Sequence, residues 1–265
     1  MSSLTYNIPA AMVGSFRGQK LIVRAKDPSE LVQNLLLSDI KDVAFVQLTD
    51  LNAGTEPLVG WGEGVPVDLV LDEPSANFAS LYSYSALQHK HPVRVTVPVR
   101  PGFSKAVRLA LALKFAVKLD IGQPDALLIA ELTSLLDLYL HRTTTEQPIE
   151  FFHCIFLSFY RDELASLWQI QEEDPDLYCF VADDGEKVNS RRMGTTTVDA
   201  GPAAKGNAEC GWCEFFDRCR GFFKLPDPDY DCGGIKSLFT TLRNEAKGIQ
   251  ADLIRYENSR HGERV

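Results

Sequence analysis

Four cysteines within one short stretch are the residues best suited to carry chemistry. The stretch ECGWCEFFDRCRGFFKLPDPDYDC, residues 209–232, contains Cys210, Cys213, Cys219 and Cys232, and the whole chain has 6 cysteines. Two thiolates separated by two residues can grip a metal from a tight turn. Two further thiolates complete either a tetrahedral site or the ligands of an iron–sulfur cluster. The spacing therefore predicts a metal centre rather than ordinary core packing.

The spacing leaves two kinds of metal centre open. Structural zinc usually takes its ligands from two pairs of cysteines in short turns, and only Cys210 and Cys213 form such a pair. Nearby aromatic side chains could shield a cluster from water or form the core of a small lobe; they are Trp212, Phe215, Phe216, Phe222, Phe223 and Tyr230. We therefore favour a 4Fe–4S cluster, with a Zn²⁺ site formed by the same four cysteines as the alternative.

The rest of the sequence contains no complete catalytic motif. Cys154 and Cys179 are flanked by apolar residues and are predicted to be small buried side chains. The run Gly60–Gly64 lacks the residues of a phosphate-binding loop and is predicted to be a turn. His89 and His91 adjoin Pro92 and are expected in a loop. Catalytic residues therefore stay unassigned, and an independent catalytic activity is not expected.

Composition limits the partners. The chain has 265 residues and a formal net charge of -9, which argues against a nucleic-acid surface because phosphates demand a basic face. No apolar run approaches the roughly 20 residues that span a bilayer, and the first residues lack the pattern of a secretory signal. Clustered cysteines in a chain of this length favour reduced thiols. The sequence therefore predicts a cytoplasmic protein without membrane or nucleic-acid partners.

The elements that must position the cysteines begin with alternating strands and helices. Residues 21–25, 42–50, 66–72, 93–99 and 115–122 read as strands, and residues 27–40, 73–91, 101–114 and 123–141 read as helices. This alternation predicts βαβ units and a parallel α/β sheet, open or part of a barrel.

The pattern changes after about residue 150. Periodicity leaves 149–174 open between helix and strand. Residues 177–190 predict a hairpin with Asp184 and Gly185 in its turn, and 195–208 predict a connector. A final helix from Ile235 to Tyr256 carries an apolar stripe with alternating spacings of four and three residues. The stripe either seals the cysteine-rich lobe onto the rest or docks a partner, and we favour the former.

The cysteine pattern resembles the C-terminal half of the SPASM domain, which occurs in radical SAM enzymes that mature peptides and proteins. The matching residues are the run Cys210-x2-Cys213-x5-Cys219 and the more distant Cys232. The resemblance covers roughly residues 179–235. It implies that Cys210, Cys213, Cys219 and Cys232 hold one auxiliary 4Fe–4S cluster. The family's second, inner cluster lacks its ligands here, because Phe223 and Ser190 stand at two cysteine positions and Cys179 fits the third poorly.

The same resemblance implies an N-terminal partial (β/α)6 barrel. The family's Cys-x3-Cys-x2-Cys motif, which binds the cluster that cleaves SAM, is absent, and the first cysteine is Cys154. The chain is therefore expected not to cleave SAM itself. A second family with a similar cysteine run, nucleases with an iron–sulfur staple, fits poorly because its Glu-x-Lys motif is missing from the β-rich half.

The sequence thus leads to one main hypothesis. Residues 1–165 would form a degenerate radical-SAM-like partial barrel, and residues 166–265 a SPASM-like lobe with a long C-terminal helix. The protein would be an accessory subunit to a radical SAM enzyme, binding its peptide or protein substrate or relaying electrons. A zinc-dependent interaction protein and an enzyme with a site at the barrel mouth are the alternatives. Homo-oligomers and hetero-oligomers both remain open.

Overall fold

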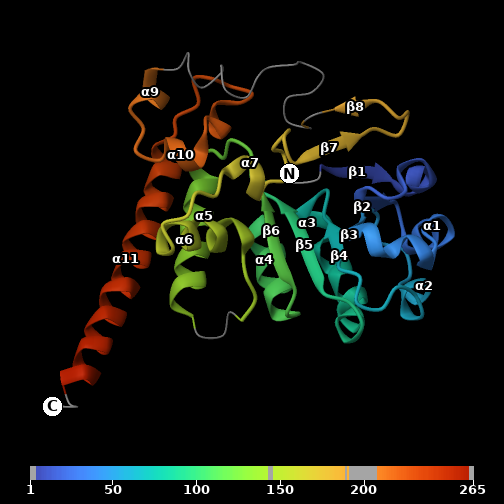
Figure 1. Ribbon diagram of the computed structural model, residues 1–265, viewed down its shortest axis with the longest axis horizontal. Coiled ribbons are helices and arrows are strands. Elements are labelled where there is room, and N and C mark those ends of the chain that lie inside the picture. The colour runs from blue at the N-terminus through green and yellow to red at the C-terminus, as the bar shows by residue number, and fades with distance from the viewer. Residues whose placement is uncertain (1–3, 143–145, 189, 191–207, 263–265) are drawn as a thin grey trace.

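The centre of the molecule is one mostly parallel sheet. The computed structural model describes residues 4–142, 146–188, 190 and 208–262. Its eight strands follow the order β6-β5-β4-β3-β2-β1-β7-β8, and only β7 and β8 are antiparallel neighbours (Figure 1). The strands are β1 Thr5–Pro9, β2 Lys20–Ala25, β3 Val43–Leu48, β4 Val67–Val70, β5 Val93–Pro98, β6 Ala116–Asp120, β7 Tyr178–Val181 and β8 Lys187–Val188. The predicted α/β class and parallel sheet are confirmed.

Helices follow most of the strands. They are η1 Ala10–Phe16, α1 Pro28–Asn34, η2 Leu37–Asp42, α2 Glu56–Val59, α3 Pro74–Asn77, η3 Phe78–His89, α4 Phe103–Ala112, α5 Ala126–His141, α6 Glu150–Tyr160, α7 Leu167–Ile170, α9 Ala208–Gly211, α10 Phe216–Cys219, η4 Phe222–Lys224 and α11 Gly233–Gly262. Two of them begin at aspartates, because the side chains of Asp27 and Asp125 accept hydrogen bonds from the free backbone N–H groups of α1 and α5.

The structure corrects three expectations about local structure. Residues 73–91 do not form one α-helix, because a single turn, α3, continues as the 3-10 helix η3. Its buried side chains Leu81, Tyr84 and Leu87 are three residues apart, which matches the three residues per turn of a 3-10 helix. Helix α1 ends at Asn34, earlier than predicted. Strand β1 was not predicted, and it pairs with both β2 and β7.

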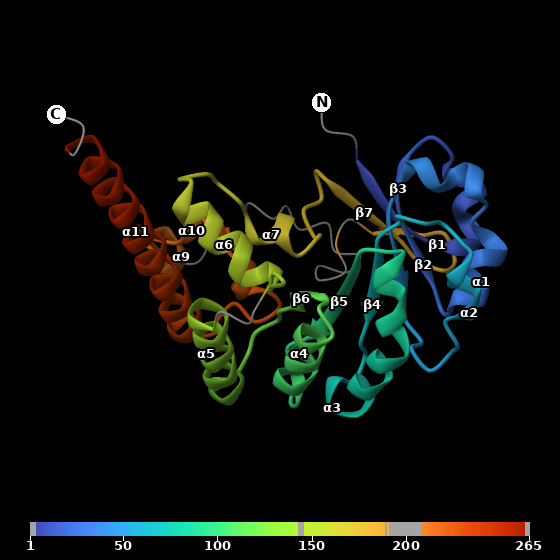
Figure 2. The same cartoon turned by 90° about the horizontal axis from the view of Figure 1, so that it is seen from below.

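The sheet has one apolar face and one polar face. Helices α1 to α4 lie along one side of the strands in Figure 2, and side chains such as Val46, Leu69, Val95 and Val117 are fully buried there. Side chains alternate between the two faces of a strand. The neighbouring positions Gln47, Asp68, Arg94 and Lys118 therefore point to the opposite face.

The C-terminal part packs beside β6. Residues 150–160, which the sequence left undecided, form α6, and α11 packs against α6 and α5. The C-terminal half of α11 extends away from the body in both views. The hairpin β7–β8 turns at Gly185, whose φ of 89° lies in the left-handed region. The predicted connector covers residues 195–208. Its residues 195–207 lie outside the described part of the chain.

One hydrophobic core runs through the described chain, from Ile8 on β1 to Leu242 on α11. A search of the described residues finds no helix with the length and apolar character to cross a membrane.

Candidate metal centre

Short helices and turns at the start of α11 place the four cysteines. Cys210 lies in α9, Cys213 follows in the next turn, Cys219 ends α10, and Cys232 directly precedes α11. The chain reverses after Cys219 because Arg220 and Gly221 have φ values of 47° and 74°, both left-handed. Glycine tolerates this conformation without strain. The turn returns the chain toward Cys210, so that residues far apart in the segment face one another.

All four predicted ligands line one pocket. Cys210 and Cys232 are buried, while Cys213 and Cys219 are half-buried, and all four are free thiols. Besides the cysteines, the lining residues are Glu209, Phe215, Phe216, Gly221, Phe223, Lys224, Ile235, Lys236 and Phe239. The fold thus brings together the cysteines that the sequence singled out.

The four thiols do not converge on a single point. In the described parts of the chain, no three His, Cys, Asp or Glu side chains form a group that could hold a metal ion. Tetrahedral zinc with Zn–S bonds of about 2.3 Å needs sulfur atoms about 4 Å apart. Cysteine ligands of a cubane cluster stand farther apart, because each binds a different iron.

Aromatic rings enclose much of the pocket. Phe215 and Phe239 meet edge to face with centroids 5.5 Å apart, and Phe223 contacts Phe222 in the same way at 5.3 Å. Phe215, Phe223 and Phe239 line the pocket, and Phe222 packs against Phe223 outside the lining. Trp212 does not contribute, because its side chain is 93% exposed on the turn between Cys210 and Cys213.

Burial and charge act in opposite directions on the thiols. Burial raises the pKa of the Cys232 thiol to about 11, while the positive charge of Lys224 lowers it. Burial also raises the pKa values of Cys210 and Cys219. Because metal and cluster ligands are thiolates, binding would displace protons from these groups.

Several polar contacts attach the pocket to the rest of the fold. Gln123, at the end of β6, donates from Nε2 to the carbonyl oxygens of Phe223 and Asp227 at 2.9 and 2.7 Å. Tyr230 donates its hydroxyl to the carbonyl of Pro124 at 2.7 Å. Arg218 donates from Nε to Ser158 Oγ on α6 at 2.9 Å. The pocket is therefore held against the β6 edge of the sheet.

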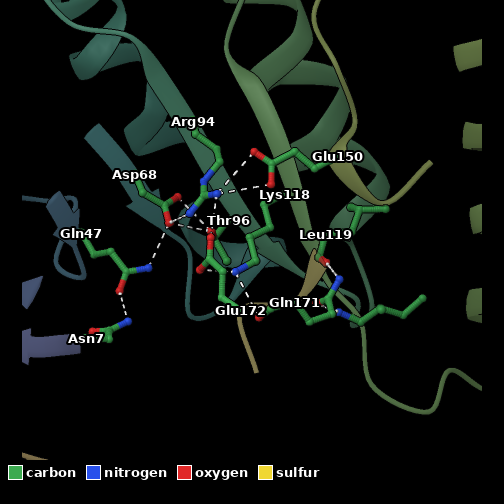
Figure 3. Close-up of polar contacts among 11 residues, drawn as sticks. Asn7, Gln47, Asp68, Arg94, Thr96, Lys118, Leu119, Glu150, Gln171 and Glu172 are labelled. Carbon is green, nitrogen blue, oxygen red and sulfur yellow. Dashed lines mark hydrogen bonds and ion pairs between the residues drawn. The ribbon is translucent and has the colours of Figure 1, made fainter. Parts of the chain in front are cut away.

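A second constellation lies on the polar face of the sheet (Figure 3). Asp68 on β4 accepts hydrogen bonds from Gln47, Arg94 and Thr96 at 2.8 to 3.0 Å. Arg94 also contacts Glu172 at 2.9 Å and Glu150 at 3.3 Å.

Lys118 completes this polar row. Its Nζ lies 2.6 Å from Glu172 Oε2, and its side chain is 2% exposed. Asn7 extends the row to β1 by donating to Gln47. Sequence reasoning did not select these residues. The sequence does mark the four residues on β3 to β6, because each is a polar side chain within a mainly apolar strand. They are Gln47, Asp68, Arg94 and Lys118.

The polar row is fully paired. Among the described residues, no buried side-chain nitrogen or oxygen lacks a hydrogen-bond partner. Burial alone would raise the pKa of Glu172, but Lys118 and Arg94 outweigh it and lower that pKa to about 2. At neutral pH the Glu172 carboxylate is therefore ionised and paired with Lys118 and Arg94. The arrangement therefore suits an internal brace for the strands better than an acid–base site.

The two remaining cysteines lie away from the four-cysteine pocket. Cys179 on β7 is 6% exposed, which agrees with the predicted buried side chain. Cys154 on α6 is only half-buried, and its pKa is raised to about 11 by burial and by Glu150. Neither lines the pocket of the other four, so both serve as internal controls.

The chain was compared with known proteins at three levels. No protein-family model, no curated protein sequence and no solved structure matches it.

Proposed function

We propose that this chain is an iron–sulfur protein in which Cys210, Cys213, Cys219 and Cys232 hold one 4Fe–4S cluster. The observation that carries the proposal is that these four residues line one pocket, together with four phenylalanines. Four cysteines would leave no iron open to a substrate, so the cluster's role is electron transfer or support of the fold.

We further propose that the pocket belongs to a SPASM-like lobe following a degenerate radical-SAM-like domain. Six consecutive parallel strands, β1 to β6, pair in sequence order, which supports a relationship to a (β/α)6 partial barrel. Phe223 is fully buried in aromatic contacts, and Ser190 donates to Glu173 at 2.6 Å. Both side chains already have partners within the fold, which supports the loss of the inner cluster.

The proposed role is that of an accessory subunit in radical-SAM-dependent peptide or protein maturation. The chain would bind the substrate or relay electrons, and the radical SAM partner would cleave SAM. In support, the chain has no Cys-x3-Cys-x2-Cys motif, and the polar row is fully paired.

The first test is the iron and sulfide content of protein purified without oxygen, with its visible spectrum. We expect about four irons and four sulfides per chain and a broad band that bleaches on reduction. Alanine at any of the four pocket cysteines should lower the content at least severalfold. Cys154→Ala and Cys179→Ala are the controls and should keep it. One zinc per chain and no colour would instead identify a structural zinc protein.

The accessory role needs its own test. If a radical SAM enzyme is encoded beside this gene, it would be co-purified with the wild-type chain and with Cys219→Ala, and peptide modification would be measured with each. The lack of any such gene would count against the accessory role. We expect a stable complex with the wild type and several-fold slower modification with the variant. No complex and an unchanged rate would refute the accessory role while leaving the cluster assignment intact.

A further inference from the structure

Two lysines and one glutamate form a charged group on the wall of the four-cysteine pocket. Lys224 Nζ lies 2.6 Å from Glu209 Oε2 and 2.7 Å from the carbonyl oxygen of Tyr230. Lys236 Nζ lies 2.6 Å from the other oxygen, Glu209 Oε1. Glu209 therefore bridges two cations that both line the pocket.

Lys224 is the unusual member of this group. Its side chain is only 5% exposed, whereas those of Lys236 and Glu209 are 36% and 41% exposed. Lysines are rarely buried unless their charge is compensated. An ammonium group has three donors, and Glu209 and Tyr230 accept from two of them. Among the described contacts the third donor has no acceptor, and Lys224 lines the pocket.

The positive charge of Lys224 would interact with the negative charge of a cluster bound in the pocket. A 4Fe–4S cluster with four thiolate ligands is negatively charged, and it becomes more negative when it accepts an electron. The wall residues contribute two positive charges and one negative charge. Net charge and hydrogen bonds to sulfur are among the factors that set a cluster's reduction potential. A buried cation beside the cysteines favours the reduced form, because screening by water is weak there.

We propose that Lys224 is a positioning residue that raises the reduction potential of the cluster, with Glu209 partly offsetting its charge. The inference rests on the function proposed above. One electron enters the cluster from a one-electron donor, which in the test is the SO2 radical anion that dithionite releases, and within the protein and the cluster no bond breaks and no proton moves. Lys224 thereby makes the cluster easier to reduce by a partner.

The experiment compares midpoint potentials of anaerobically purified variants by spectroscopically monitored dithionite titration. Lys224→Met removes the charge at similar length. We expect the reduction equilibrium to become at least tenfold less favourable, which is about 59 mV for a one-electron couple. Lys224→Arg keeps the charge and should stay close to the wild type. Lys236→Met is the matched control at the more exposed position and should shift the potential less.

A second variant is expected to shift the reduction potential in the opposite direction. It therefore distinguishes an electrostatic effect from unfolding of the pocket. Glu209→Gln removes the carboxylate that offsets Lys224, so the potential should rise. General disruption of the pocket would not move these two variants in opposite directions. If Lys224→Met cannot hold the cluster, Glu209→Gln decides the question alone, because an unchanged or lower potential overturns the inference.

The two proposals fail in distinguishable ways. Wild-type protein without iron and sulfide would refute the cluster and this inference with it, before any variant is compared. Wild-type protein with a full cluster, and loaded variants that all share its potential, would refute only the role of Lys224. The charged group would then serve only to join α9 to α11.

Discussion

Glu172 lies between two cations on the polar face of the sheet, and its surroundings decide its charge. It contacts Lys118 at 2.6 Å and Arg94 at 2.9 Å, with its side chain 10% exposed. Breaking a buried pair leaves the other charge without compensation, which costs more than the pair contributes. The polar row is therefore sensitive to single substitutions, although its net stabilisation is modest.

We expect Glu172→Gln to lower the free energy of unfolding by about 3 kcal/mol at pH 7, because Lys118 is left buried without its partner charge. Urea denaturation measures the loss. Glu146→Gln is the control, because Glu146 pairs with Lys114 at the surface, where both side chains are about two-thirds exposed. It should change stability by less than about 0.5 kcal/mol. Equal losses would contradict the bracing role.

The effect of Glu172→Gln should also depend on pH. The folded pKa of Glu172 is lowered to about 2 from an ordinary value of 4.5. Its stabilisation is therefore complete above about pH 4.5 and disappears as the pH falls through 2. The stability difference between wild type and variant should roughly halve between pH 7 and pH 3. A difference that stays constant over this range would show that the charge of Glu172 is not what stabilises.

At the scale of elements, α11 lines the cysteine pocket at its start and packs against α5 and α6. The buried part of its apolar stripe, including Ile235, Phe239 and Leu242, packs on the body, whereas Ile249 and Leu253 are each 45% exposed. The first half of the stripe therefore packs on the body, and a role in sealing one lobe onto another stays a prediction. Close packing begins at Gly234, where a Cβ atom would lie 2.8 Å from Cγ1 of Ile129 on α5.

Two glycines of α11 should respond to alanine with opposite signs. Gly234→Ala should lower the free energy of unfolding by about 1–3 kcal/mol, because α11 must move away from Ile129. Gly248→Ala should raise it by about 0.5–1 kcal/mol, because nothing lies within 4 Å of the added Cβ atom and alanine is the better helix former. Urea denaturation compares the two, and destabilisation by both would contradict the packing argument.

At the scale of the whole molecule, the cysteine segment and the sheet share one hydrophobic core but differ in regular structure. The cysteine segment contains only short helices, α9, α10 and η4, and contacts such as Gln123 with Phe223 hold it to β6. Strands β1 to β7 are paired with their neighbours and contribute side chains to that core. The two regions should therefore respond differently to loss of the cluster.

We expect removal of iron by a chelator under oxidation to increase amide hydrogen exchange at least tenfold within residues 209–232. Strands β1 to β6 should keep their protection, because their backbone hydrogen bonds are made to neighbouring strands and not to the cysteine segment. Hydrogen exchange with mass spectrometry measures both regions in one sample, and Cys210→Ala, purified without cluster, is the matched comparison. Loss of protection throughout the sheet would show that the cluster stabilises the whole fold.

The parallel sheet followed from local patterns. Apolar runs of strand length alternated with amphipathic helices, and the structure contains this alternation from β2 to α5. These signals lie within one element, so the sequence contains them in full. Strand β1 was missed because the segment TYNIP contains polar residues and a proline, and its strand conformation comes from the neighbours β2 and β7.

For the candidate site, too, some features followed from the sequence and others only from the tertiary structure. By itself, the sequence determined which four cysteines to consider, because their spacing is a local property. Only the tertiary structure decided that they share one pocket, that Lys224 and Lys236 line it, and that Trp212 is exposed. The polar row likewise needed strand order and register, since Gln47, Asp68 and Arg94 become neighbours only across the sheet. Contacts between distant segments depend on how elements pack, and no local pattern records that packing.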